Sequence, residues 1–259
     1  MNQHSDGDLY ERSSATLLAS WEEYARGAED ASLQRYAGVA AAVFPNEPER
    51  SVYNNALLEL HLSFQERADA LDAMEAAYAA VGVDRFAAWV HEADGAMRHD
   101  IERCGYRIDT STRAMSMPLE DIRLPRPEID LAPPDWAEHL RIAGVPPGFL
   151  AAADPTAYHV LLARLDGETV ATAMSFDHAG DCGIYNVGTL EHARRRSLGT
   201  ALTAIQLHDA CARGCETASL QSTPLAERVY AAAGFRDLGR ILEYVPNKAC
   251  VARRVAQDR

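Results

Sequence analysis

One stretch of sequence, residues 187–202, restricts what this chain can fold into more than any other. A β-forming run leads into it and continues to Leu190, and from Leu198 onward the apolar residues recur at helical spacing. Three consecutive arginines, Arg194 to Arg196, occupy the turn between the two patterns. At the start of a helix several backbone N–H groups lack an intrahelical acceptor, and the helix dipole is positive there. The stretch therefore predicts a strand, a basic turn and a helix N-terminus that together bind phosphate or pyrophosphate.

Composition limits the partners of this anion site. The chain has 259 residues, of which 47% are hydrophobic, so it can bury a core. Its net charge of −13 argues against nucleic acid or an anionic membrane, because both require a broad positive surface. The sequence has neither an N-terminal secretory signal nor an apolar run near the ~20 residues of a membrane span. We therefore expect a cytoplasmic protein that binds a small molecule, and the charge favours a cationic one.

A proline-rich stretch divides the chain into two halves of similar pattern. Residues 118–134 contain five prolines and several charges, which is typical of a linker. Residues 101–107 and 230–236 share one form, in which a helix end is followed by glycine, an aromatic residue, arginine and a strand. We infer two copies of one fold. The predicted domains are residues 1–124, a linker at 125–134, and residues 135–259.

Only the second copy keeps the anion site. Its counterpart in the first copy, residues 65–70, has no glycine and contains two acidic residues, so it would not hold a pyrophosphate. Each copy is expected to be an α+β domain, with a central, mostly antiparallel sheet flanked by helices. The predicted helices are residues 13–36, 65–81, 93–104, 135–143, 198–214 and 224–233. The predicted strands are residues 37–44, 51–62, 85–90, 107–117, 158–165, 169–176, 182–190, 217–221 and 238–245.

The motifs of the second half resemble the GCN5-related N-acetyltransferase (GNAT) superfamily. Its acetyl-CoA loop, Arg/Gln-x-x-Gly-x-Gly/Ala, aligns with Arg194-Arg195-Arg196-Ser197-Leu198-Gly199, followed by Thr200. A later signature, Asn-x-x-Ala-x-x-x-Tyr and then Gly-Phe, aligns with residues 223–230 and 234–235. The resemblance covers residues 158–245 and implies a tandem GNAT protein whose N-terminal copy is degenerate. It implies acetyl-CoA as the cofactor.

Two positions depart from the family pattern. Ser197 replaces the first loop glycine, which restricts the backbone although the side chain is small. A shifted alignment that begins at Arg196 and uses Gly199 and Ala201 also satisfies the pattern, but it starts the helix later. Thr223 replaces the usual asparagine, so a shorter hydroxyl is left to contact the pantetheine arm.

The resemblance also implies roles in catalysis. Backbone N–H groups of Val187, Gly188 and Thr189 are expected to stabilise the oxyanion. Tyr230 is expected to be the general acid beside the CoA sulfur, although a tyrosine before Gly-Phe can be a core aromatic. Asp181 occupies a position like that of the glutamate base in some members, but aspartate is also common in turns.

The leading hypothesis is direct acetyl transfer from acetyl-CoA to a small-molecule primary amine in the C-terminal domain. Alternatives are a non-catalytic acyl-CoA-binding module and an O-acyl or longer-acyl transferase on the same scaffold. Both a monomer and a homodimer fit the sequence. No metal is expected, because Cys211 and Cys215 are not accompanied by another Cys or His pair.

Overall fold

The structure, a computed structural model, describes residues 4–46, 53–146 and 148–247. The chain forms two compact units, each assembled from two segments. Unit 1 consists of Met1–Tyr24 and Arg113–Leu238, and unit 2 of Ala25–Thr112 and Gly239–Arg259. These units differ from the predicted domain ranges, because most of the first helix belongs with the C-terminal half, and residues 239–246 of the last strand belong with the N-terminal half.

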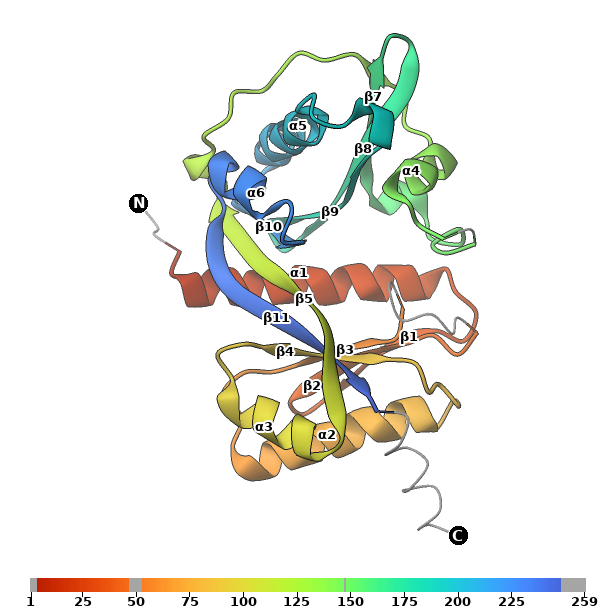
Figure 1. Cartoon of the computed structure of the whole chain (residues 1–259), viewed down its shortest axis with the longest axis vertical. Helices are drawn as coiled ribbons and strands as arrows, with labels where there is room; N and C mark the ends of the chain where they lie inside the picture. The colour runs from red at the N-terminus through yellow and green to blue at the C-terminus, as the bar shows by residue number, and fades with distance from the viewer. Residues whose placement is uncertain (1–3, 47–52, 147, 248–259) are drawn as a thin grey trace. The chain divides into compact units, whose positions relative to one another are not determined.

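Both units are mixed α/β structures, which confirms the predicted fold class (Figure 1). The helices are α1 (Asp6–Arg26), α2 (Phe64–Ala79), α3 (Gly95–Arg103), α4 (Trp136–Ala143), α5 (Leu198–Arg213) and α6 (Glu227–Ala233). The strands are β1 (Ser32–Tyr36), β2 (Val39–Val43), β3 (Asn55–Leu58), β4 (Ala87–His91), β5 (Tyr106–Pro118), β6 (Leu131–Ala132), β7 (His159–Leu165), β8 (Glu168–His178), β9 (Asp181–Thr189), β10 (Thr217–Ser222) and β11 (Arg236–Pro246).

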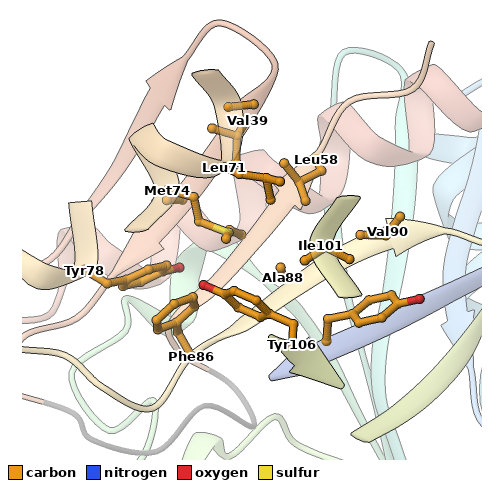
Figure 2. Close-up of a cluster of buried hydrophobic side chains, with 14 of the residues drawn as sticks. Val39, Leu58, Leu71, Met74, Tyr78, Phe86, Ala88, Val90, Ile101 and Tyr106 are labelled. Carbon is orange, nitrogen blue, oxygen red and sulfur yellow. The ribbon is translucent and has the colours of Figure 1, made fainter. Parts of the chain in front are cut away.

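Unit 2 has a sheet with α2 and α3 on one side (Figure 1). β1, β2 and β3 pair antiparallel in succession, and β3 then pairs parallel with β4. Alternate residues of β2, β3 and β4, among them Val39, Leu58 and Val90, point into one buried cluster with Met74 of α2 and Ile101 of α3, as Figure 2 shows. This alternation is the period of two expected for a sheet with one face against helices.

The sheet strands of unit 1 lie in the order β5-β10-β9-β8-β7-β6. The pairs are antiparallel except that of β9 with β10, which is parallel. Ala171 and Ala173 of β8 pack with Leu202 of α5, whereas Thr172 between them bonds to His139 of α4. Consecutive residues of a strand point to opposite faces, so α4 and α5 cover opposite faces of this sheet (Figure 1).

Two strands begin in one unit and end in the other. Residues 113–118 of β5 pair with β10 inside unit 1. Residues 241–244 of β11 pair with residues 88–91 of β4 inside unit 2. Each half of the sequence therefore supplies its last strand to the other unit, which is why the predicted domain ranges and the compact units differ.

Most predicted elements are confirmed within a few residues, and the largest error lies at residues 27–36. A single helix was expected over residues 13–36, but α1 ends at Arg26 and β1 begins at Ser32. Gly27 and Asp30 explain the break, since glycine ends helices and Asp30 has a φ of +58° that no helix accommodates. The Asp166-Gly167 hairpin is confirmed, with positive φ at both residues as a type I′ turn requires. Residues 51–52 of the predicted strand 51–62 lie outside the described residues.

Across residues 4–46, 53–146 and 148–247, no helix combines the length and the apolar character that crossing a membrane requires.

Candidate functional site

The candidate site is the place where β9 and β10 separate. The two strands are paired at only three positions, the last of which joins Gly183 to Ser219. β9 continues to Thr189 and β10 to Ser222 without further pairing between them. The edge of β9 that faces away from β8 is therefore open beyond Gly183, and its backbone groups are available to a ligand.

A bulge in β9 accompanies this separation. Asn186 and Val187 lie opposite one residue of β8, since Thr172 pairs with Gly188 and Met174 with Tyr185. Asn186 has a φ of +50°, a conformation that asparagine tolerates better than most residues. A bulge bends its strand and increases the local twist, and this directs the end of β9 away from β10.

Past the bulge, the side chains of β9 alternate between the two helices. Gly199 of α5 lies beside Val187 and Thr189, whereas Gly188 lies against Ile142 of α4. The N–H of Leu190 bonds to β8. In an antiparallel pair the backbone groups alternate in direction, so those of Thr189 point to the open edge. Of the three predicted oxyanion donors, the backbone of Thr189 thus has the required direction.

The N-terminus of α5 lies beside the end of β9, and the backbone there has a conformation that leaves N–H groups without a partner. Arg195 and Ser197 both have positive φ, at +64° and +58°. α5 begins at Leu198, which supports the alignment of Ser197 with the family's first loop glycine over the shifted one. Ser197 makes no side-chain cap, and the first intrahelical N–H bond runs from Ala201 to Ser197. The N–H groups of Leu198, Gly199 and Thr200 precede that bond and are left for a ligand.

The three loop arginines are exposed, and none forms an ion pair with a carboxylate in the described part of the chain. Arg194 donates from Nε to the carbonyl oxygen of Thr189 at 3.3 Å, which holds the loop against the end of β9. Three uncompensated cations beside a helix N-terminus, in a chain with a net charge of −13, form a local concentration of positive charge of the kind that suits phosphate groups.

Tyr230 lies close to the same opening. This residue of α6 belongs to one buried cluster with Ile184 of β9 and Leu220 of β10, and Val187 packs against that cluster. Burial raises the pKa of Tyr230 to about 12, so the phenol stays protonated at neutral pH. Thr223 is exposed and directly follows β10.

Asp181 lies at the opposite end of β9 from Thr189. It is buried, and its two carboxylate oxygens accept hydrogen bonds from the hydroxyls of Thr217 and Ser219, each at 2.6 Å. Both hydroxyls belong to β10, so the carboxylate joins the two strands where they are paired. The separation of six or more residues along an extended strand, at about 3.3 Å each, keeps Asp181 away from the opening.

His139 was not among the candidate residues, and the structure places it on the face of the sheet opposite α5. Its side chain has no exposed surface, and Nδ1 lies 2.7 Å from the hydroxyl oxygen of Thr172. Burial lowers the pKa of His139 to about 4, so the imidazole is neutral at pH 7. A signal existed in the sequence, since Trp136, His139 and Ile142 recur at helical spacing on one face of a predicted helix.

Within the described ranges, no group of three or more His, Cys, Asp or Glu side chains is arranged to hold a metal ion.

Comparisons with known proteins agree with this geometry. Residues 148–222, which include β7 to β10 and the loop before α5, match the family model of the acetyltransferase (GNAT) domain. A comparison with curated protein sequences finds no match.

Solved structures with this fold include three informative neighbours. A GCN5-related N-acetyltransferase from Kribbella flavida is 22% identical, with a TM-score of 0.70, over 90% of this chain and 93% of its own. One from Sphaerobacter thermophilus is 19% identical, with a TM-score of 0.61, over 92% of this chain and 87% of its own. A GCN5-related glucosamine N-acetyltransferase region of a fungal β-N-acetylglucosaminidase is 14% identical, with a TM-score of 0.55, over 90% of this chain and 37% of that one.

The fold and the matched segment are similar to those of acyltransferases of the GNAT type. Residues 148–222 carry the similarity to the GNAT acetyltransferase domain, so an acyl-transferring enzyme is the class that this segment indicates. The fold supports acyl-CoA-dependent acetyl transfer in general, with acetyl-CoA as the usual donor.

Proposed function

We propose that this protein transfers an acetyl group directly from acetyl-CoA to a small-molecule primary amine, and that the reaction takes place in unit 1. The observation that carries the proposal is the position of the α5 N-terminus. Its free N–H groups and the three loop arginines lie beside the open edge of β9. A phosphate site and an open strand edge at this spacing suit the pyrophosphate and the amide-rich arm of CoA.

The residues fit this cofactor in their chemistry. The N–H groups of Leu198, Gly199 and Thr200 are available for a pyrophosphate, and Gly199 has no side chain to cover them. Arg194, Arg195 and Arg196 would neutralise its charge, and Thr223 offers a hydroxyl to the pantetheine arm. Backbone groups of β9 near Val187, Gly188 and Thr189 would bind the thioester end, with the N–H of Thr189 directed toward it.

In the proposed reaction, bound acetyl-CoA supplies the acetyl group, so that a C–N bond to the amine forms and the C–S bond breaks. The N–H of Thr189 stabilises the negative charge that develops on the carbonyl oxygen. Tyr230 donates its proton to the departing sulfur, which its raised pKa permits because the phenol is protonated. The proton released by the amine leaves to solvent, since the hydrogen bonds of Asp181 within the paired part of β9 and β10 argue against its predicted role as the base.

A single cofactor site is proposed, because the N-terminus of the equivalent helix in unit 2 is capped by its own side chains. α2 follows β3 and precedes the parallel strand β4, just as α5 follows β9 and precedes β10. At the start of α2, Ser63 and Glu66 cap each other: the Ser63 N–H donates to the Glu66 carboxylate at 2.7 Å, and the Ser63 hydroxyl accepts from the Glu66 N–H. An acidic side chain over satisfied N–H groups excludes a pyrophosphate. This contrast supports a degenerate N-terminal copy.

Two observations favour a small, cationic amine as the acceptor. The chain carries a net charge of −13, which attracts cations. One structural neighbour is described as a glucosamine N-acetyltransferase region, and glucosamine is a small primary amine. The acceptor is therefore sought among amino sugars, polyamines, aminoglycosides and amino acids.

The test is acetyl-CoA turnover, read as thiol release, with spermidine, kanamycin, lysine and glucosamine as acceptors. Replacing Arg194, Arg195 and Arg196 by glutamine should raise KM for acetyl-CoA by about tenfold or more and weaken its salt dependence, because charge-assisted contacts to phosphate are lost. Arg103→Gln, at an exposed position of α3, is the matched control and should change neither the KM for acetyl-CoA nor its salt dependence.

The alternatives give different results in the same assay. Tight acetyl-CoA binding without turnover, unchanged by Tyr230→Phe, would identify a non-catalytic binding module. Turnover with alcohols or with longer acyl-CoA donors, in preference to acetyl-CoA and amines, would identify an O-acyl or longer-acyl transferase.

A further inference from the structure

The strongest unexplained feature of unit 1 is a buried nitrogen. Nε2 of His139 has no hydrogen-bond partner within the described residues, although the side chain is completely buried. Buried polar atoms are nearly always hydrogen-bonded, and an unpaired one in a folded protein calls for an explanation. A ligand that the free protein does not hold is one such explanation.

The tautomer of His139 follows from its neighbours. The hydroxyl of Thr172 lies 3.0 Å from the carbonyl oxygen of Leu161, and we assign its hydrogen to that oxygen, which leaves the hydroxyl to accept from His139. With this assignment Nδ1 of His139 carries the hydrogen, and Nε2 carries a buried lone pair without a hydrogen-bond donor in the described residues. The chain of two hydrogen bonds fixes the imidazole as a hydrogen-bond acceptor.

The position of His139 relates it to the proposed reaction. Thr172 pairs with Gly188, which directly follows the bulged residues Asn186 and Val187 of β9. Adjacent strands lie about 4.8 Å apart. The imidazole, which is bonded to Thr172, is therefore separated from the open part of β9 by the width of one strand. α5 covers the other face of the sheet, and with it the proposed pyrophosphate site. An acceptor that reaches the thioester from the face without the cofactor approaches on the side of α4, under which His139 is buried.

One aromatic ring, that of Trp136, packs against the His139 ring, and two further rings continue the row from it. The Trp136 ring lies 5.3 Å from the His139 ring and stacks on Tyr158 at 5.5 Å, and Tyr158 contacts Phe176 at 5.6 Å. Ring faces attract ammonium groups, and their apolar bodies strengthen a hydrogen bond made between them.

We propose that Nε2 of His139 accepts a hydrogen bond from the amino group of the acceptor, and that Thr172 and Leu161 hold the tautomer that makes this possible. The inference rests on the acetyl transfer proposed above, and it names the residue that recognises the amine. His139 has no exposed surface in the free protein, so the acceptor reaches it by displacing side chains around α4, and the new hydrogen bond offsets that displacement.

Two substitutions separate the nitrogens of the ring. Asparagine can place an N–H near the position of Nδ1 and keep the bond to Thr172, but it does not reach the position of Nε2. Glutamine can place a carbonyl oxygen near Nε2 but loses the bond to Thr172. We expect His139→Asn to raise KM for the best amine of the panel by about tenfold or more, with KM for acetyl-CoA unchanged. His139→Gln should stay within about threefold of the wild-type KM for the amine, as should the exposed control His99→Asn.

The opposite pattern would overturn the proposal. If His139→Asn equals the wild type while His139→Gln is impaired, the side chain acts only through Thr172 and the nitrogen has no ligand. Imidazole ¹⁵N chemical shifts supply a readout that does not need turnover, because they report the tautomer and the partner of Nε2. A shift of the His139 Nε2 resonance on adding spermidine or glucosamine supports the proposal even if no amine is acetylated, and an unmoved resonance at saturating amine refutes it.

Discussion

Gly188 of β9 lies directly against Ile142 of α4. A Cβ added to Gly188 would stand 2.8 Å from the carbonyl oxygen of Ile142 and 2.9 Å from Cα of Ala143. Both are backbone atoms, so the helix would have to move to make room. Thr172, the pairing partner of Gly188, bonds to His139 of α4. The two paired residues therefore fix the position of this helix on the sheet.

Replacing Gly188 by alanine should therefore destabilise the protein by about 1–3 kcal/mol, the usual cost of overpacking a closed contact. The measurement is the midpoint of urea unfolding, with the m-value checked for constancy. Activity should fall as well, because α4 lies over the bulge in β9. Unchanged stability would mean that the close approach of α4 does not depend on glycine.

Gly199→Ala, unlike Gly188→Ala, should increase the free energy of unfolding. The added Cβ would find ordinary contacts, 3.6 Å from a methyl carbon of Val187. Alanine is favoured over glycine in a helix by about 0.5–1 kcal/mol, so unfolding should require more urea. Acetyl-CoA affinity, measured by calorimetry, should nevertheless fall, because the new methyl group covers the N–H groups proposed to bind the pyrophosphate. A rise in both quantities would count against this position of the cofactor.

Ser197→Gly should stabilise the loop. Ser197 has a φ of +58°, which costs an L-residue about 1–2 kcal/mol and glycine nothing. After the greater entropy of glycine in the unfolded chain is subtracted, we expect a net gain of about 0.5–1 kcal/mol. Ala212→Gly, at an exposed position of the same helix, is the control and should lose about 1 kcal/mol.

Tyr230→Phe should lower kcat by a factor that does not change between pH 7 and pH 10. The pKa of Tyr230 is raised to about 12 by burial, so its proton is present throughout this range and is lost only at higher pH. We expect a loss of about 10²-fold, typical of removing a general acid. A wild-type activity that declines between pH 8 and pH 10, with Tyr230→Phe lacking this decline, would show instead that the tyrosine ionises in that range.

Acid should destabilise the fold partly through His139. Its pKa is lowered from 6.5 to about 4 by burial, so the unfolded chain binds the proton more tightly than the folded one. The stability is complete above pH 6.5 and is lost as pH falls toward 4, with about 3 kcal/mol as the upper limit for this group. His139→Asn cannot titrate, so its unfolding free energy should depend less on pH over this interval. Parallel curves for the two proteins would contradict the assignment.

The elements and the anion loop could be predicted from local patterns. Helical spacing located α2, α4 and α5, and the Asp-Gly turn located the hairpin of β7 and β8. The loop was recognisable because glycine, arginine and helix start have fixed spacing whatever surrounds them. Its positive φ at Ser197 agrees with the glycine that the family pattern has there.

The role of single side chains could not be predicted in the same way. Asp181 was a candidate base from its position relative to the loop, but Thr217 and Ser219 hold it from a strand 36 residues or more away. Tyr230, the expected general acid, packs beside the separation of β9 and β10. His139 showed only as a polar residue on an apolar helix face. Such contacts depend on which strands become neighbours, and no local pattern encodes that.

By itself, then, the sequence determined most of the helices and strands in their order, the basic turn and helix start at α5, and the absence of a glycine at the matching position before α2, because backbone preferences and caps act within a few residues. Only the tertiary structure decided where β9 leaves β10, which unit receives β5 and β11, and that Nε2 of His139 has no partner. These features arise from pairing between segments distant in the chain, where packing and the satisfaction of buried hydrogen bonds select one arrangement.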